Sequence, residues 1–276
     1  MRARAVFAAL LLLVTCVACG SGSVSPGDSL VKRARDGDHL TVGIRFDQPG
    51  LSQRTVDGRF VGFDVDVAKF VAGELGVDPA HITWHETTPA TRESDLTSGS
   101  VDLVVATYSI TDKRKQLVSF AGPYFVTGQD LLVRLTSPDI TGPESLNGRR
   151  LCSVTGSTPA QQVRDKFAQA VQLVEYPRYP DCVTALLAGQ VDAVTTDAVI
   201  LAGYVAQDPE LLRVVGHPFS TERYGVGLRK GDTDGQHAVD DAIRKMVADG
   251  EWLRSLQANI GPSNYPLPKP PEITEQ

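Results

Sequence analysis

Leu96-Thr-Ser-Gly-Ser-Val-Asp-Leu-Val104 decides the fold, because its pattern Leu-x-x-Gly-x-Val-Asp-x-Val returns 90 residues later as Leu186-Leu-Ala-Gly-Gln-Val-Asp-Ala-Val194. Each copy is typical of a helix end, a glycine that caps the helix, and a buried parallel strand. Two copies are too few for a solenoid. The repeat therefore predicts two similarly built α/β lobes.

The segments around the repeat support this interpretation. Leu40–Ile44 has the composition of a strand, and 64–75 places apolar residues at helical spacing. Near the end of the chain, 224–229 predicts a strand and 241–256 an amphipathic helix, which we assign back to the first lobe. The chain would then cross between the lobes twice, at about 126–132 and 219–226, and form a two-strand hinge beside an interlobe cleft.

These boundaries give a complete domain plan. The plan is an export signal at 1–19, a flexible tether at 20–37, lobe 1 at 38–128 and 224–260, lobe 2 at 129–223, and a tail at 261–276. The tail is rich in proline, which predicts an extended and poorly ordered end.

The N-terminus predicts export. Arg2 and Arg4 precede the apolar run 5–14, which is too short to remain as a membrane span. Cys19 follows a small residue and resembles the lipidation site of bacterial lipoproteins, with Cys16 as the weaker candidate and an ordinary signal peptide as the alternative. Lipid chains on Cys19 would anchor the protein stably to the cell membrane from outside.

Charge and cysteines narrow the function. Removing residues 1–19 leaves 25 Lys and Arg against 33 Asp and Glu, an acidic balance that disfavours nucleic-acid binding. Cys152 and Cys182 remain, and an oxidising compartment favours one disulfide between them. The histidines are scattered, so we expect no metal site.

Several motifs together resemble the solute-binding proteins of bacterial polar amino-acid ABC transporters, solute-binding protein family 3, over about residues 38–258. In order, they are Gly62-Phe-Asp-Val-Asp66, Val101-Asp-Leu103, Ser109-Ile-Thr-Asp-Lys-Arg114, Phe120-Ala-Gly-Pro-Tyr-Phe125 and Val191-Asp-Ala-Val-Thr-Thr-Asp197. Phe46-Asp-Gln-Pro-Gly50 further resembles glutamate-binding members of Gram-positive bacteria. The resemblance implies a type II periplasmic-binding-protein-like fold that closes over one amino acid.

Arg114 is the first candidate ligand residue. With Thr111 or Asp112 as N-cap, it falls in the first turn of a helix, where the helix dipole disfavours a cation unless an anion is bound. Its planar guanidinium can hold a carboxylate through two hydrogen bonds. The resemblance implies that Arg114, Ser109 and the Thr107 main chain hold the ligand α-carboxylate. The alternative is a surface arginine paired with Asp112 or Glu93.

Lobe 2 supplies the opposite wall. Val154-Thr-Gly156-Ser157-Thr158-Pro159 predicts a strand, a turn and a helix start, whose amides form an anion site. The resemblance gives Gly156, Ser157 and Thr158 contacts to the ligand, although many relatives have a basic residue at 154 or 155. The alternative is a well-capped helix without a ligand.

Asp197 ends a predicted strand and begins an apolar helix. It fits an N-cap, and the resemblance implies that it binds the ligand α-ammonium. Asp64 and Asp66 fit the acidic first turn of a helix, so we assign them to structure.

Two further arginines suggest an acidic ligand. Arg45 ends the first strand and Arg92 begins the helix leading to Leu96. The resemblance implies that relatives binding glutamate and aspartate have arginine at both positions, whereas glutamine-binding relatives have aspartate at the first. Surplus positive charge in a closed cleft would favour a second carboxylate. Alternatively, either arginine is solvated or paired with Glu86 or Glu93.

We therefore expect a monomeric, lipid-anchored receptor without cofactor that binds L-glutamate, or else aspartate or glutamine, and delivers it to an ABC permease driven by an ATPase. No catalytic Ser/His/Asp order or P-loop appears in the sequence. The alternatives are an enzyme similar to cyclohexadienyl dehydratases, and a ligand sensor that acts through a separate membrane partner.

Overall fold

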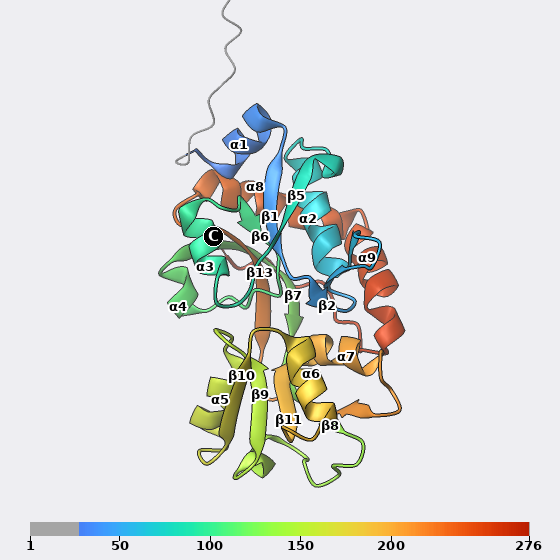
Figure 1. Cartoon of the computed structure of the whole chain (residues 1–276). Coiled ribbons are helices and arrows are strands. Elements are labelled where there is room, and N and C mark those ends of the chain that lie inside the picture. Colours follow the sequence, from blue (N-terminus) through green and yellow to red (C-terminus); the bar gives the residue numbers. More distant parts are fainter. Residues whose placement is uncertain (1–27, 276) are drawn as a thin grey trace, which may run out of the picture.

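The chain folds into two lobes joined by a pair of strands (Figure 1). The structure, a computed structural model, describes residues 28–275. Each lobe is built on one five-stranded sheet flanked by helices. The two-lobed α/β fold predicted from the repeat is confirmed.

Lobe 1 contains the sheet with strand order β5-β1-β6-β13-β7. Its strands are β1 (Leu40–Ile44), β5 (Ile82–Glu86), β6 (Leu103–Val104), β7 (Val118–Thr127) and β13 (Glu222–Arg229), with a small second sheet of β2 (Asp47–Gln48), β3 (Ser52–Arg54) and β4 (Phe60–Val61). Its helices are α1 (Leu30–Gly37), α2 (Phe63–Glu74), α3 (Arg92–Ser98), α4 (Asp112–Lys115), α8 (Thr233–Ala248) and α9 (Glu251–Asn259), with 3-10 turns η1 (Pro79–His81) and η3 (Gly261–Ser263).

Lobe 2 contains the sheet with strand order β10-β9-β11-β8-β12. Its strands are β8 (Gln129–Arg134), β9 (Arg150–Val154), β10 (Gln172–Tyr176), β11 (Ala193–Asp197) and β12 (Leu212–Val214). Its helices are α5 (Pro159–Lys166), α6 (Tyr179–Leu187) and α7 (Ala198–Val205), with the 3-10 turn η2 (Pro143–Leu146).

The sequence repeat occupies equivalent places in the two lobes. In lobe 1, α3 ends at Gly99, whose φ is 76°, and β6 then pairs in parallel with β1. In lobe 2, α6 is followed by Gly189 with φ 71°, and β11 pairs in parallel with β9. Glycine adopts this left-handed conformation without the steric cost of a Cβ atom, so the predicted helix-cap-strand units are confirmed.

Two crossings connect the lobes. β7 and β13 pair antiparallel from Val118 with Arg229 to Thr127 with Glu222. The chain enters lobe 2 at Gly128, where a Cβ atom would lie 2.7 Å from the backbone oxygen of Ser220 in the returning segment. This division supports the predicted change of lobe at 128–129, whereas β13 of the lobe 1 sheet begins at Glu222, two residues before the predicted return at 224. The division into 38–128 with 224–260 and 129–223 remains a proposal.

The lobes are closed on each other. The Tyr204 hydroxyl of α7 donates to the Asp47 backbone oxygen at 2.5 Å, and Arg178 forms an ion pair with Glu86 at 2.6 Å. The backbones also approach closely, because a Cβ atom on Gly203 would lie 2.4 Å from the Pro49 oxygen. All three contacts join lobe 2 to lobe 1.

The predicted cysteine pair is present as a disulfide. Cys152 on β9 and Cys182 on α6 are both buried, and their Cα atoms lie 5.7 Å apart. The bridge therefore ties α6 to the sheet of lobe 2.

The structure corrects the prediction of a tether that extends to residue 37. Leu30 and Ala34, one helical turn apart, are buried in lobe 1, and the Ser29 hydroxyl caps α1 by accepting from the Lys32 amide. Residues 30–37 therefore form part of lobe 1. The export signal, Cys19 and the first part of the tether lie outside the described residues.

A second correction concerns the last helix. The segment predicted as one helix over 241–256 covers the end of α8 and the start of α9, which are separated at Gly250 with φ 76°. Both helices bury an apolar face, so the periodicity of the sequence continues through the break.

The proline-rich tail is also docked, which contradicts the poorly ordered end that we predicted. The hydroxyls of Tyr265 and Thr127 lie 2.9 Å apart, and the amides of Thr274 and Glu275 donate to the Gly122 oxygen. Glu275 also forms an ion pair with Lys115 at 2.5 Å. These long-range contacts hold the tail along β7.

Candidate functional site

A small cavity lies between the lobes. Its wall in lobe 1 is formed by Gln48, Pro89, Arg92, Thr107, Ser109 and Arg114, and its wall in lobe 2 by Ser157, Thr158, Pro159, Tyr179, Thr196, Asp197 and Ile200. Seven of the nine ligand residues predicted from the sequence are thus brought together. The two that do not line the cavity are Arg45 and Gly156.

Arg114 is held in place by its own helix start. The Thr111 hydroxyl accepts from the Arg114 amide at 3.2 Å and so caps α4. The guanidinium is buried, donates to the Ser109 oxygen at 2.8 Å and lies 3.3 Å from Glu93. The ion pair considered as the alternative interpretation is therefore present, and Arg114 nevertheless forms part of the cavity wall.

Arg92 begins α3 and is the least satisfied cation of the cavity wall. Among residues 28–275, its guanidinium makes one hydrogen bond, to the Ala106 oxygen at 3.3 Å, and its Nε makes none. The Nε lies 3.9 Å from Glu93. Burial, with a smaller effect of Arg114, lowers the pKa of Arg92 to about 9. A buried guanidinium with a free donor is suited to an incoming carboxylate.

Arg45 is placed differently from our expectation. It is buried, but its Nη2 and Nε donate to the Asp47 carboxylate at 2.7 and 3.0 Å, and its Nη1 donates to the Thr87 oxygen. Residues two apart in an extended chain point to the same side, which brings the side chain of Asp47 to that of Arg45. Arg45 is therefore neutralised within lobe 1.

Thr107 lines the cavity in an uncommon backbone conformation, with φ of 45°. Its amide donates at 2.8 Å to Oδ2 of Asp64, which does not line the cavity, and its hydroxyl contacts Gln48 at 3.2 Å. We predicted that the Thr107 main chain contacts the ligand, but its N–H group already donates to Asp64.

The lobe 2 wall begins at the turn before α5. Thr158 is the N-cap and Pro159 the first residue of α5, as predicted, although the Thr158 side chain makes no capping hydrogen bond. Ser157 donates to the Val154 oxygen at 2.5 Å. Gly156, with φ 78°, faces lobe 1 instead of the cavity, and a Cβ atom there would lie 2.8 Å from Ala90 Cα.

Asp197 ends β11 at the cavity. The Tyr224 hydroxyl, which comes from the crossing strand β13, donates to Asp197 Oδ2 at 2.5 Å. Burial and, secondarily, the charge of Glu222 raise the pKa of Asp197. An ammonium group beside this carboxylate would relieve both effects.

Other cavity residues were not identified from the sequence. Gln48 lies within the quoted 46–50 segment, but an amide side chain after a strand gives no sign of a ligand contact. Tyr179 and Ile200 fall on apolar helices, where they are indistinguishable from core residues by pattern alone. Tyr224 does not line the cavity but donates to Asp197, and its place on the second crossing strand did not predict this contact.

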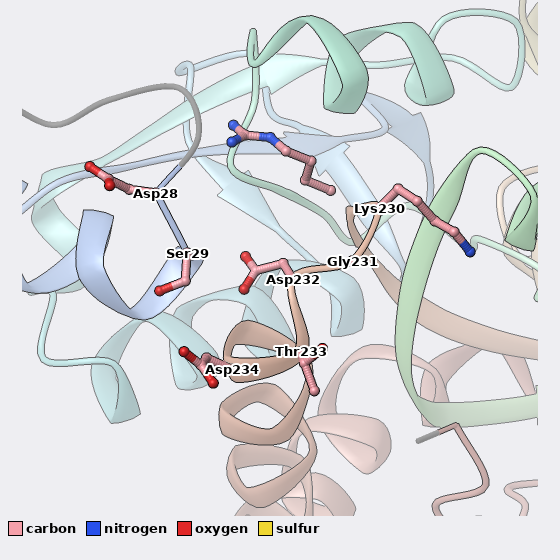
Figure 2. A pocket seen from close by; sticks show the side chains of 8 residues that line it. Asp28, Ser29, Lys230, Gly231, Asp232, Thr233 and Asp234 are labelled. Atoms are coloured by element: carbon pink, nitrogen blue, oxygen red, sulfur yellow. The ribbon is translucent and has the colours of Figure 1, made fainter.

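A separate hollow lies on the outside of lobe 1, between α1 and the start of α8 (Figure 2). Its Asp232 carboxylate accepts from the amides of Leu30 at 2.7 Å and Gly235 at 2.9 Å, so it joins the two helices. None of the predicted ligand residues lines this hollow.

Two classes of feature are not found over residues 28–275. No group of three or more His, Cys, Asp and Glu side chains there is arranged to hold a metal ion. In the same part of the chain, no helix combines the length and apolar character needed to cross a membrane.

Comparison with known proteins places this geometry in context. Residues 40–261 match the family of bacterial extracellular solute-binding proteins, family 3. The chain is 45% identical to the glutamate-binding protein GluB of Corynebacterium efficiens over 94% of this chain and 90% of that protein. It is 34% identical to the ABC transporter glutamine-binding protein GlnH of Bacillus subtilis over 88% and 90%. An ancestral arginine-binding protein bound to arginine superimposes with a TM-score of 0.76 at 32% identity, over 81% of this chain and 99% of that one.

Proposed function

Because the chain belongs to the bacterial extracellular solute-binding proteins of family 3, a family of binding proteins and not of enzymes, we propose that it binds L-glutamate between its lobes. L-Aspartate and L-glutamine are the weaker candidate ligands. The similarity to GluB, a glutamate-binding protein, supports this choice.

The proposal rests on the charged side chains that line the cavity. Two arginines, Arg92 and Arg114, line the cavity together with one carboxylate, Asp197. Glu93 lies outside this lining, 3.3 Å from Arg114 and 3.9 Å from Arg92, and offsets part of the arginine charge. L-Glutamate would offer each arginine a carboxylate and Asp197 an ammonium group, whereas L-glutamine would leave Arg92, which lies no nearer than 3.9 Å to Glu93, without a carboxylate. Arg45 enters this balance only indirectly, because Asp47 already neutralises it.

Each end of the ligand has a suitable partner. Arg114 and Ser109 would hold the α-carboxylate, Asp197 the α-ammonium, and Arg92 the side-chain carboxylate. Ser157 and Thr158 would contact the ligand from lobe 2. Since such a ligand touches both lobes, its binding favours the closed arrangement over an open one.

We also propose that the protein is anchored and works with an importer. Lipid attachment at Cys19 would hold it at the outer face of the membrane, and the monomer would deliver its ligand to a permease coupled to an ATPase. A Cys19→Ser variant should leave the membrane fraction of expressing cells, with Cys16→Ser as its control.

One calorimetric screen tests the ligand assignment. The refolded, ligand-stripped chain is titrated with each common L-amino acid, and glutamate should bind most tightly. Tighter binding of glutamine or arginine would overturn the glutamate assignment. Absence of binding to every amino acid would overturn the cavity as an amino-acid site.

A further inference from the structure

Asp64 lies in the first turn of α2, within the Gly62–Asp66 motif, and its side chain is fully buried. It does not cap its helix, because the N-cap position is Gly62 and makes no side-chain capping bond. Its two oxygens accept from separate donors outside the helix: Oδ2 from the Thr107 amide at 2.8 Å, and Oδ1 from the Tyr124 hydroxyl at 2.9 Å.

This arrangement is costly for the folded protein. Asp64 makes no ion pair with a cation among the described residues, and burial raises the pKa of its carboxyl to about 7. Apolar residues of similar shape often replace buried charged groups without loss of stability. Stability of the core alone therefore does not account for a carboxylate at this place.

The neighbouring Asp66 shows what a structural role looks like in the same helix. Its Oδ2 accepts from the Ser255 hydroxyl at 2.6 Å and the Asn259 side chain at 2.8 Å. These bonds tie α2 to α9. Neither partner lines the interlobe cavity.

Asp64 instead acts on a strained part of the cavity wall. Thr107 has a φ of 45°, and among the described residues with positive φ it alone is β-branched. Left-handed conformations are strained for a residue of this kind. The hydrogen bond from the Thr107 amide to Asp64 opposes that strain.

The same peptide unit reaches Arg92. The amide of Thr107 and the carbonyl of Ala106 belong to one planar peptide and point in opposite directions. With the amide directed at Asp64, the carbonyl accepts from Arg92 Nη1 at 3.3 Å. Turning this peptide would therefore remove the single hydrogen bond that orients the Arg92 guanidinium.

We propose that Asp64 is a positioning residue for ligand binding, which holds the Ala106–Thr107 peptide so that Thr107 keeps its left-handed conformation and Arg92 faces the cavity. This inference rests on the proposed function only in that the cavity is the ligand site. It does not depend on which amino acid is bound.

A double-mutant cycle tests the proposal. Asp64→Leu keeps the branched shape but removes both acceptors, and Asp64→Asn keeps one acceptor for the Thr107 amide. Each is combined with Thr107→Gly, which adopts positive φ without strain, and with Thr107→Ala, which removes the hydroxyl but retains the strain. Asp66→Asn is the matched control. Affinity is measured for the L-amino acid that the wild-type chain binds best.

We expect Asp64→Leu to weaken binding about tenfold or more, both in the wild-type chain and in the Thr107→Ala variant, each compared with the same chain with native Asp64. Combined with Thr107→Gly, the same substitution should weaken binding less than about threefold. Asp64→Asn should retain affinity within about threefold of wild type. An equal loss when Asp64→Leu is combined with Thr107→Ala and with Thr107→Gly, or full affinity of a folded Asp64→Leu variant, would overturn the proposal.

A spectroscopic measurement keeps the proposal testable if Asp64→Leu does not fold. The Thr107 amide resonance of the labelled, ligand-free chain should shift as Asp64 ionises and lose that shift in Asp64→Asn. An amide resonance that does not respond to pH in wild type would overturn the proposal. A wild-type chain that binds no amino acid would refute the proposed function and leave this measurement unaffected.

Discussion

The guanidinium of Arg92 lies over the ring of Tyr108, with its Cζ atom 3.9 Å from the ring centroid. This contact supports the cation without satisfying its N–H groups. Arg92 therefore lies in the cavity wall with an Nε donor that has no hydrogen-bond partner among residues 28–275.

Arg92→Met should weaken glutamate binding by about 2–4 kcal/mol relative to glutamine binding, because only glutamate has the carboxylate that pairs with this residue. Calorimetric titration of both ligands against both proteins measures the difference. Equal weakening for the two ligands would contradict the role of Arg92 in selecting an acidic side chain.

Arg45→Met should behave differently. It leaves the buried Asp47 carboxylate without its cation, so we expect a loss of about 3–5 kcal/mol in the free energy of unfolding and similar effects on glutamate and glutamine. Urea unfolding gives the first quantity. A selective loss of glutamate affinity would show that Arg45 contacts the side-chain carboxylate of the ligand directly.

Gly203→Ala should obstruct closure. A Cβ atom at this position would lie 2.4 Å from the Pro49 oxygen across the interface, whereas alanine favours the helix α7 itself. We expect ligand affinity to fall at least about tenfold while the ligand-free melting temperature stays equal or rises. Small-angle scattering should show an open shape in the presence of ligand. Wild-type affinity of the Gly203→Ala variant would mean that the closed interface can accommodate the added Cβ atom.

The stability of the ligand-free chain should fall as pH rises from 5 to 8. Burial raises the pKa of Asp64 from 3.8 to about 7, so between these values the folded state binds a proton that the unfolded chain has released. The free energy of unfolding should then decrease by up to about 1.4 kcal/mol per pH unit for this group. Urea unfolding of Asp64→Asn should show a smaller slope; an unchanged slope would assign the effect to other groups.

The disulfide should stabilise lobe 2. It joins residues 30 apart, and the chain-entropy account gives about 3.6 kcal/mol for a loop of this length. Replacing Cys152 and Cys182 by serine should lower the free energy of unfolding by that amount. Thiol titration of the oxidised, unfolded chain without residues 1–19 should find no thiol, and two thiols would exclude the bridge.

The sequence predicted what depends on local pattern. The strand Leu40–Ile44 has the bounds of β1, and the two glycine caps follow α3 and α6, because periodicity and backbone freedom act within a few residues. The break at Gly250 was not predicted, since α8 and α9 continue one apolar pattern.

The candidate site could be predicted only in part. Three predicted residues occupy the cavity wall because Arg92 begins α3, Arg114 lies in the first turn of α4 and Asp197 ends β11. The pairing of Arg45 with Asp47 depends on two nearby side chains turning to the same side of the chain, and was not among the partners we considered. The docking of the tail depends on contacts such as Tyr265 with Thr127, which are 138 residues apart and which no local pattern shows.

Both ends of the described chain are attached to lobe 1: Leu30 of α1 by its bond to Asp232, and the tail by its bonds to Gly122. If the protein were attached to a surface through either of these ends, lobe 1 would be the fixed lobe and lobe 2 would move relative to it. Reporters fused at the two ends would both be attached to lobe 1, so the distance between them would not report lobe opening. A sensor built from this protein needs one reporter on lobe 2, for instance at the exposed Leu187 at the end of α6, where opening changes the distance to lobe 1.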